Sequence, residues 1–124
     1  MFAQTSAFSG FSVNDLNAAR EFYGDKLGVE VSDENGMLVL HIVGGGDILI
    51  YPKDDHTPAT FTILNFPVED IDETADRLGE KGIEFVRYEG FPQDDRGIMR
   101  GQGPAIAWFL DPAGNVLSVL EESR

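Results

Sequence analysis

The chain has 124 residues, 42% of them hydrophobic, and acidic residues outnumber basic ones by 22 to 9, so its formal net charge is −13. A field of this sign repels phosphate backbones and anionic lipids, which argues against a nucleic-acid partner or a membrane partner. No apolar run reaches the roughly 18 residues of a membrane-spanning helix. The absence of cysteine excludes disulfides and thiolate chemistry. The first residues lack the pattern of a signal peptide, so we expect a cytoplasmic protein.

The first half of the chain combines strand signals with one set of helix signals. Asp15 or Asn14 is placed to cap a helix, because its side chain can accept a hydrogen bond from a first-turn amide. Gly28 is placed to end that helix, and Asn35–Gly36 is a strong hairpin signal. In chain order, the predicted elements are a strand at 7–13, a helix at 16–27, and strands at 29–31, 37–43 and 47–51.

The second half repeats this order after a polar linker at Pro52–Pro58. Asp70 is placed to cap a helix that Gly82 ends. A long glycine-rich segment, Gly90–Pro104, is a candidate lid or binding loop. In chain order, the predicted elements are a strand at 60–68, the helix between Asp70 and Gly82, and strands at 83–88, 105–110 and 115–121.

Two similar units therefore follow one another, each with the order β-α-β-β-β. Residues 13–16 of the first unit overlay residues 68–71 of the second, where each strand passes into its helix. We expect a single domain at 6–122, built from modules at 6–52 and 59–122.

Three features carry a resemblance to a known family. They are the helix start at Asp15–Leu16, the pair Phe22–Tyr23 followed by Leu27–Gly28, and the turn at Asp111–Asn115. In this order they resemble the vicinal oxygen chelate superfamily, which includes glyoxalase I, bleomycin-resistance proteins and extradiol dioxygenases. The resemblance implies an α+β fold in which two βαβββ modules form an open eight-stranded cup around a cavity. It also implies a homodimer, in which modules can be exchanged between chains.

Enzymes of this family hold a divalent metal with His, Glu or Gln side chains on the first and last strands of each module. Carried onto this sequence, the four ligand positions fall on Phe8, Ile48, Ile63 and Ser118. Phenylalanine and isoleucine offer no lone pair, and a shift of one residue produces no His/Glu set. The resemblance therefore leads us to expect no metal, and we expect no other cofactor.

A few polar and aromatic residues remain as candidates. His41, in a predicted strand, is either a base in the cavity or a structural histidine. Ser12 and Asn65 share the strand parity of the ligand positions, so we expect both side chains to point into the cup. There they hydrogen-bond a ligand, or they bond each other or water. Of the adjacent Trp108 and Phe109, one faces inward.

The glycine-rich segment contributes Met99 and Arg100. An arginine here orients a carboxylate of the ligand, stacks on a ring, or pairs with the acidic surface, which includes Asp94 and Asp95. No Ser-His-Asp order typical of a hydrolase and no nucleotide-binding fingerprint is visible.

These observations predict a metal-free protein of the bleomycin-resistance type that binds a small aromatic or cationic molecule between its modules. The alternative is a metal-dependent lyase or dioxygenase of the same superfamily with displaced ligands such as His41. Neither a catalytic residue nor the identity of the ligand follows from the sequence. The predicted ligand-binding residues are Phe8, Ser12, His41, Ile48, Ile50, Ile63, Asn65, Met99, Arg100, Trp108 and Ser118.

Overall fold

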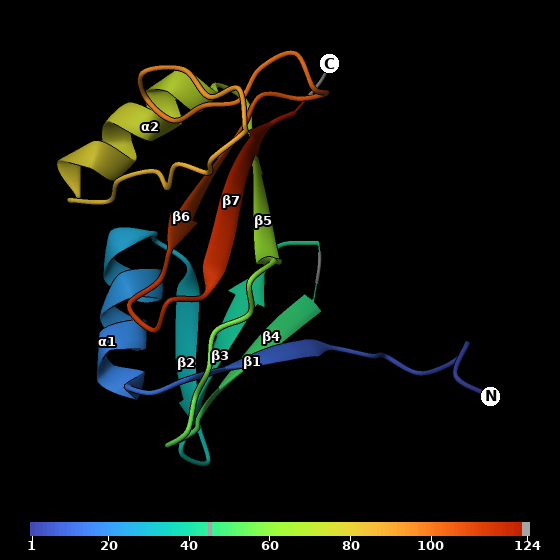
Figure 1. Ribbon diagram of the computed structural model, residues 1–124. Helices are drawn as coiled ribbons and strands as arrows, with labels where there is room; N and C mark the ends of the chain where they lie inside the picture. The colour runs from blue at the N-terminus through green and yellow to red at the C-terminus, as the bar shows by residue number, and fades with distance from the viewer. Residues whose placement is uncertain (45, 123–124) are drawn as a thin grey trace. The chain divides into compact units, whose positions relative to one another are not determined.

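A computed structural model describes residues 1–44 and 46–122 of the chain. It contains two compact units, Met1–Thr57 and Pro58–Arg124, and each is described by itself (Figure 1). In the part of the chain that is described, no helix is long and apolar enough to span a bilayer.

The first unit has one helical segment and a sheet with strand order β1-β4-β3-β2. Strands β1 and β4 are parallel, and the other neighbours are antiparallel. Its elements are β1 (Ser9–Val13), α1 (Leu16–Arg20), η1 (Glu21–Lys26), β2 (Glu30–Glu34), β3 (Met37–Ile42) and β4 (Gly46–Pro52).

The helical segment begins and ends where the sequence predicts. The Ala18 amide donates to Asp15 Oδ1 at 3.1 Å, so Asp15 is the cap. Gly28, with φ at 75°, follows the segment in the left-handed conformation that glycine adopts at little cost. The single α-helix that we predicted is instead a short α-helix that continues as the π-helix η1, in which the Leu27 amide donates to the Phe22 carbonyl at 2.9 Å.

One face of the first sheet packs against this helical segment and forms the core of the unit. The rings of Phe11 and Tyr23 lie 5.9 Å apart, and Tyr23 is fully buried. A Cβ atom added at Gly24 would lie 3.6 Å from the Val31 side chain, so strand β2 also lies close to η1. Burial of a leucine or isoleucine side chain stabilises the folded chain by about 1.5–3 kcal/mol. Fully buried members of this face are Leu38, Leu40 and Ile50.

The second unit has a sheet with strand order β5-β7-β6, in which β5 and β7 are parallel and β6 and β7 antiparallel. Its elements are β5 (Thr62–Val68), α2 (Ile71–Glu80), β6 (Ile106–Leu110) and β7 (Val116–Glu121). Asp70 caps α2 by accepting from the Glu73 amide at 3.1 Å. The Ile71 amide donates to Glu121 Oε2 at 3.1 Å, which joins the start of α2 to β7.

The predicted strand at 83–88 is not formed as a strand, so this sheet has three strands where the repeat predicts four. One backbone bond, from the Val86 amide to the Trp108 carbonyl at 2.7 Å, still joins the segment to β6. The Gln93 side chain forms hydrogen bonds with other backbone groups of the segment. It accepts from the Tyr88 amide at 2.7 Å and donates to the Val86 carbonyl at 2.9 Å. This carboxamide satisfies groups that would otherwise need a neighbouring strand.

The turn at Asp111–Asn115 is organised by one buried carboxylate. Asp111 is 5% exposed, and its Oδ1 accepts from the Ala113 and Asn115 amides at 2.9 and 2.8 Å. Its Oδ2 accepts from the Asn115 side-chain amide at 3.0 Å. The motif therefore has a structural reason, because an aspartate here closes the turn between β6 and β7.

Candidate functional site

The sheet of the second unit has two distinct faces, and α2 covers one of them. The Glu121 carboxylate of β7 accepts a hydrogen bond from the first residue of α2. Phe109 of β6 is 1% exposed, and its ring centroid lies 6.4 Å from that of Phe85. Side chains alternate along a strand, so Ser118 and Trp108 project from the other face. We call this second surface the face opposite α2.

A row of predicted site residues crosses the face opposite α2. In the register of the sheet, Asn65 of β5 lies beside Ser118 of β7, and Ser118 lies beside Trp108 of β6. The Ser118 hydroxyl donates to Asn65 Oδ1 at 2.5 Å. Ser118 is fully buried and Asn65 is exposed, so the amide of Asn65 is accessible at the surface. The bond to a serine of the neighbouring strand was not among the alternatives expected for Asn65, which were a ligand, Ser12 or water.

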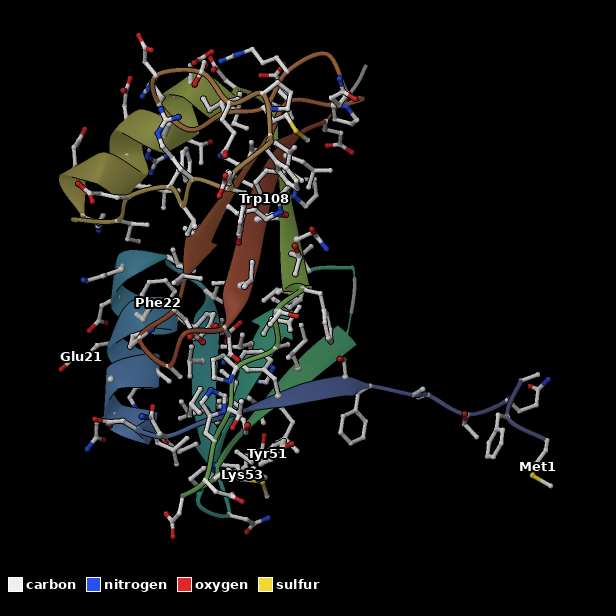
Figure 2. All side chains as sticks on the ribbon, viewed as in Figure 1. Met1, Glu21, Phe22, Tyr51, Lys53 and Trp108 are labelled. Carbon is white, nitrogen blue, oxygen red and sulfur yellow. The ribbon has the colours of Figure 1, made fainter. Side chains whose placement is uncertain are left out.

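Three aromatic rings form a cluster beside this row. Trp108, labelled in Figure 2, lies 5.5 Å from Tyr88 and 5.4 Å from Phe91 between ring centroids, and Tyr88 and Phe91 are also 5.4 Å apart. The Tyr88–Trp108 pair is edge-to-face, a favourable arrangement for aromatic quadrupoles. Phe91 is 47% exposed, so part of the cluster is open to solvent. The sequence pattern left open whether Trp108 or Phe109 faces the helix, and it did not single out Tyr88.

Met99 and Arg100 lie on opposite sides of their segment. Met99 exchanges backbone hydrogen bonds with Ile106, at 2.8 and 3.1 Å, and Ile106 shares the face of Trp108. Met99 therefore belongs to the face opposite α2. Ile63, in contrast, lies at an irregularity of the β5–β7 register and is half-buried.

Arg100 instead joins its segment to α2. Its guanidinium donates to Asp72 Oδ1 at 2.8 Å and to Asp94 Oδ2 at 3.3 Å. The hydrogen bond to Asp94 is the main cause of a raised pKa of Arg100. Arg96 also pairs with Asp72 and with Asp76, and Figure 1 shows the segment passing beside α2. Of the roles considered for these arginines, the contacts support pairing with surface acids.

In the first unit, the register separates the predicted residues into two groups. Ile50 lies opposite Phe11, which packs on Tyr23, so Ile50 faces the helical segment and is fully buried. Ile48 has the same parity as Ile50 and therefore faces the same way. Phe8 precedes β1 and is 70% exposed. The set Phe8, Ile48 and Ile50 thus does not form one lining, because strand pairing places the residues of β4 out of step with those of β1.

Polar side chains gather on the face of the first sheet opposite α1. Ser12 lies 2.6 Å from His56 Nδ1. His41 contacts Ser32 through Nε2 at 2.8 Å and Asp47 through Nδ1 at 3.0 Å. The sequence pattern indicated no Ser-His-Asp set and did not place Ser32 or Asp47 beside His41, because these contacts join three different strands.

The donor set does not fit the metal centre implied by the resemblance. Among the described residues, no group of three or more His, Cys, Asp or Glu side chains is arranged to hold a metal ion. Of the four residues at the expected ligand positions, Ser118 alone has a side-chain oxygen, and its hydroxyl donates a hydrogen bond to Asn65. A separate hollow of about 430 Å³ lies between α2 and the segment that follows it, lined by Ala75, Ile83, Glu84, Phe85, Arg87, Asp95 and Arg96. None of the predicted site residues lines this hollow.

Comparison with known proteins agrees with this architecture. An uncharacterized protein, YraH of Bacillus subtilis strain 168, is 29% identical over 122 aligned positions, and the alignment covers 86% of this chain and 90% of the relative. The fosfomycin resistance protein FosX of Listeria monocytogenes superposes with a TM-score of 0.72 at 19% identity, covering 97% of this chain and 94% of that one. TnmS3, an antibiotic binding protein from Streptomyces sp. CB03234, gives 0.68 at 23% identity, with 97% and 98% covered.

The structural likeness confirms the α+β fold that the family resemblance implies. Residues 6–119 match the sequence pattern of one family. The chain belongs to the Glyoxalase/Bleomycin resistance protein/Dioxygenase superfamily.

Proposed function

We propose that this protein binds a small aromatic or cationic molecule, without a metal ion, on the face opposite α2. The observation that carries the proposal is the cluster of Tyr88, Phe91 and Trp108 beside the Asn65–Ser118 pair. Flat aromatic surface with a few fixed polar groups is the usual composition of a small-molecule site. Ser12 and His41 of the first unit remain predicted contributors.

The aromatic cluster supports two kinds of ligand. A planar ring gains area burial and offset or edge-to-face contacts with Trp108 and Phe91. A cation over the face of a tryptophan or tyrosine gains about 0.5–2 kcal/mol, with the larger value at desolvated sites. The exposed Asn65 amide can then orient the ligand through a hydrogen bond.

Two further observations support the proposal, one for a cationic ligand and one for a binding role. The net charge of −13 raises the local concentration of cations and repels anions. The similar chain TnmS3 is described as an antibiotic binding protein, which makes binding without catalysis a reasonable role for this architecture.

Fluorescence and calorimetry test the proposal directly. Trp108 is the single tryptophan of the chain, so its emission reports on the cluster alone. We would titrate the chain, with a strong chelator present, with a cationic glycopeptide, an uncharged planar aromatic compound and an aliphatic amine. The proposal expects heat and a change in Trp108 emission with at least one aromatic ligand. No heat and no emission change with any of the three would refute it.

The alternative, a metal-dependent lyase or dioxygenase of this superfamily, is distinguished by the same titration. Binding that disappears with the chelator and returns with stoichiometric divalent metal would replace the metal-free proposal. Elemental analysis of protein purified without chelator gives an independent answer.

We further propose that modules 6–52 and 59–122 act as one domain, that the chain is a cytoplasmic homodimer, and that its partner is a small molecule. The superfamily resemblance and the absence of cysteine support these assignments. Light scattering during gel filtration measures the mass, and a monomer across the micromolar range would contradict the dimer.

A further inference from the structure

Three polar side chains on neighbouring strands of the first unit form a continuous hydrogen-bonded chain. The Ser32 hydroxyl of β2 lies 2.8 Å from His41 Nε2 on β3, and His41 Nδ1 lies 3.0 Å from Asp47 Oδ1 on β4. The register explains the arrangement. His41 is opposite Asp47, and Ser32 is opposite Val39, two residues before His41. All three side chains therefore project from the face opposite α1.

The hydrogen-bond chemistry assigns the tautomer of His41. Ionised Asp47 can only accept, so Nδ1 of His41 carries the hydrogen that faces it. In the neutral ring, Nε2 then has a lone pair and accepts the Ser32 hydroxyl proton. A serine hydrolase has the same connectivity, with the nucleophile at Nε2 and the carboxylate at Nδ1. Ser12 contacts His56 through Nδ1, so that pair has a different connectivity.

We propose that Ser32 is a nucleophile that accepts an acyl group from activated esters, with His41 as its general base and Asp47 positioning the imidazole. In acylation, Ser32 Oγ forms a bond to the ester carbonyl carbon while His41 Nε2 takes the hydroxyl proton. The bond from that carbon to the leaving oxygen breaks, and the leaving oxygen receives the proton from His41. Water activated by His41 then hydrolyses the acyl-serine and restores the Ser32 hydroxyl.

The surroundings of Ser32 indicate the substrate class. Val39 and Leu49 lie in the same cross-strand row on the same face. Val39 is buried and Leu49 is half-buried, so Leu49 offers the apolar surface for an acyl chain beside the nucleophile. The His41 and Asp47 side chains are 33% and 60% exposed, so an ester can approach from solvent. Water at the site weakens the stabilisation of developing negative charge. The substrates are therefore esters with good leaving groups, such as aryl esters of short fatty acids.

The test is labelling of the full chain with an alkyl fluorophosphonate, followed by intact mass measurement and peptide mapping. We expect one adduct, mapped to Ser32 and lost in Ser32→Ala. General-base catalysis contributes roughly 10²–10⁴-fold, so His41→Gln should slow labelling by about that factor. Asp47→Asn should slow labelling and Asp47→Glu should restore part of the rate, a difference that a purely structural role would not produce. Hydrolysis of p-nitrophenyl butyrate should follow the same order.

Ser9→Ala is the matched control, because Ser9 is an exposed serine on β1 of the same unit. Its labelling should equal that of the wild type. Mapping on the wild-type chain decides the outcome even where a variant folds poorly. No adduct at Ser32, equal adducts at Ser9 and Ser32, or unchanged labelling of a folded Asp47→Asn variant would overturn the proposal.

Discussion

Ser118 donates a hydrogen bond to Asn65 across the parallel strands β5 and β7, at the position where the superfamily resemblance places a metal ligand. The pair replaces a coordinating side chain with a neutral hydroxyl and an amide that bond each other. A polar contact therefore remains on the face opposite α2, but it offers a hydrogen-bonding group and no anionic ligand for a cation.

Replacing Ser118 tests how much this pair stabilises the fold. In Ser118→Ala the buried hydroxyl disappears, while the exposed Asn65 amide can bond water, so we expect a loss of about 0.5–1.5 kcal/mol in the free energy of unfolding. Urea denaturation measures it. Ser9→Ala, at an exposed serine, should change the same quantity by less than about 0.5 kcal/mol. An equal loss in both variants would contradict a specific role for the Ser118–Asn65 bond.

Replacing Phe91 tests whether the aromatic cluster contributes to ligand affinity. Phe91→Leu keeps an apolar side chain but removes a ring that packs 5.4 Å from Trp108. Loss of one aromatic contact costs about 0.5–1.5 kcal/mol, so the dissociation constant of an aromatic ligand should rise up to roughly tenfold. Calorimetry measures the change. Phe61→Leu is the matched control, because Phe61 is 69% exposed and precedes β5. Identical affinities of the two variants would place the ligand elsewhere.

Gln93 tests why the segment at 83–88 needs no strand. Gln93→Leu has a similar size but leaves the Tyr88 amide and the Val86 carbonyl without their side-chain partners. Both hydrogen bonds are part-buried, and the net loss of such a bond costs about 0.5–1.5 kcal/mol. We expect lower stability and faster hydrogen exchange at the Tyr88 amide. Gln102→Leu, at an exposed position of the glycine-rich segment Gly90–Pro104 that also holds Gln93, is the control. Unchanged exchange at Tyr88 in Gln93→Leu would be the contrary result.

The lowered pKa of Asp94 predicts that the free energy of unfolding depends on pH in the acid range. Burial opposes ionisation, but the Ile98 and Arg96 amides and the Arg100 guanidinium outweigh it and lower the pKa of Asp94. The folded chain thus binds this proton less tightly than the unfolded chain does. Ionised Asp94 stabilises the fold above its ordinary pKa, and this contribution is lost as the pH falls through the lower folded value.

Denaturation of the wild type and of Asp94→Asn at several pH values checks this sign. The wild type should be more stable near neutral pH, and the difference should shrink in the acid range below about pH 4. Asp95→Asn removes the same formal charge at an exposed neighbour and provides the control. A difference between wild type and Asp94→Asn that stays constant down to strongly acid pH would disprove the assignment.

Local sequence signals determined the helix starts, the helix ends and one hairpin. Asp15 and Asp70 cap the two helices, as expected from side chains that satisfy nearby amides. Asn35 and Gly36 form the predicted two-residue loop, with φ values of 53° and 78°. These features depend on residues close in sequence, which explains why they could be predicted without the tertiary structure.

The tertiary structure alone decided which side chains meet. Strand pairing placed Ile48 and Ile50 on the side of the helical segment, and it brought Ser32, His41 and Asp47 together from three strands. A shift of one residue in register moves every side chain of a strand to the other face. The hydrophobic pattern of a single strand cannot specify its register against a distant partner, so the composition of each face becomes known only from the folded sheet.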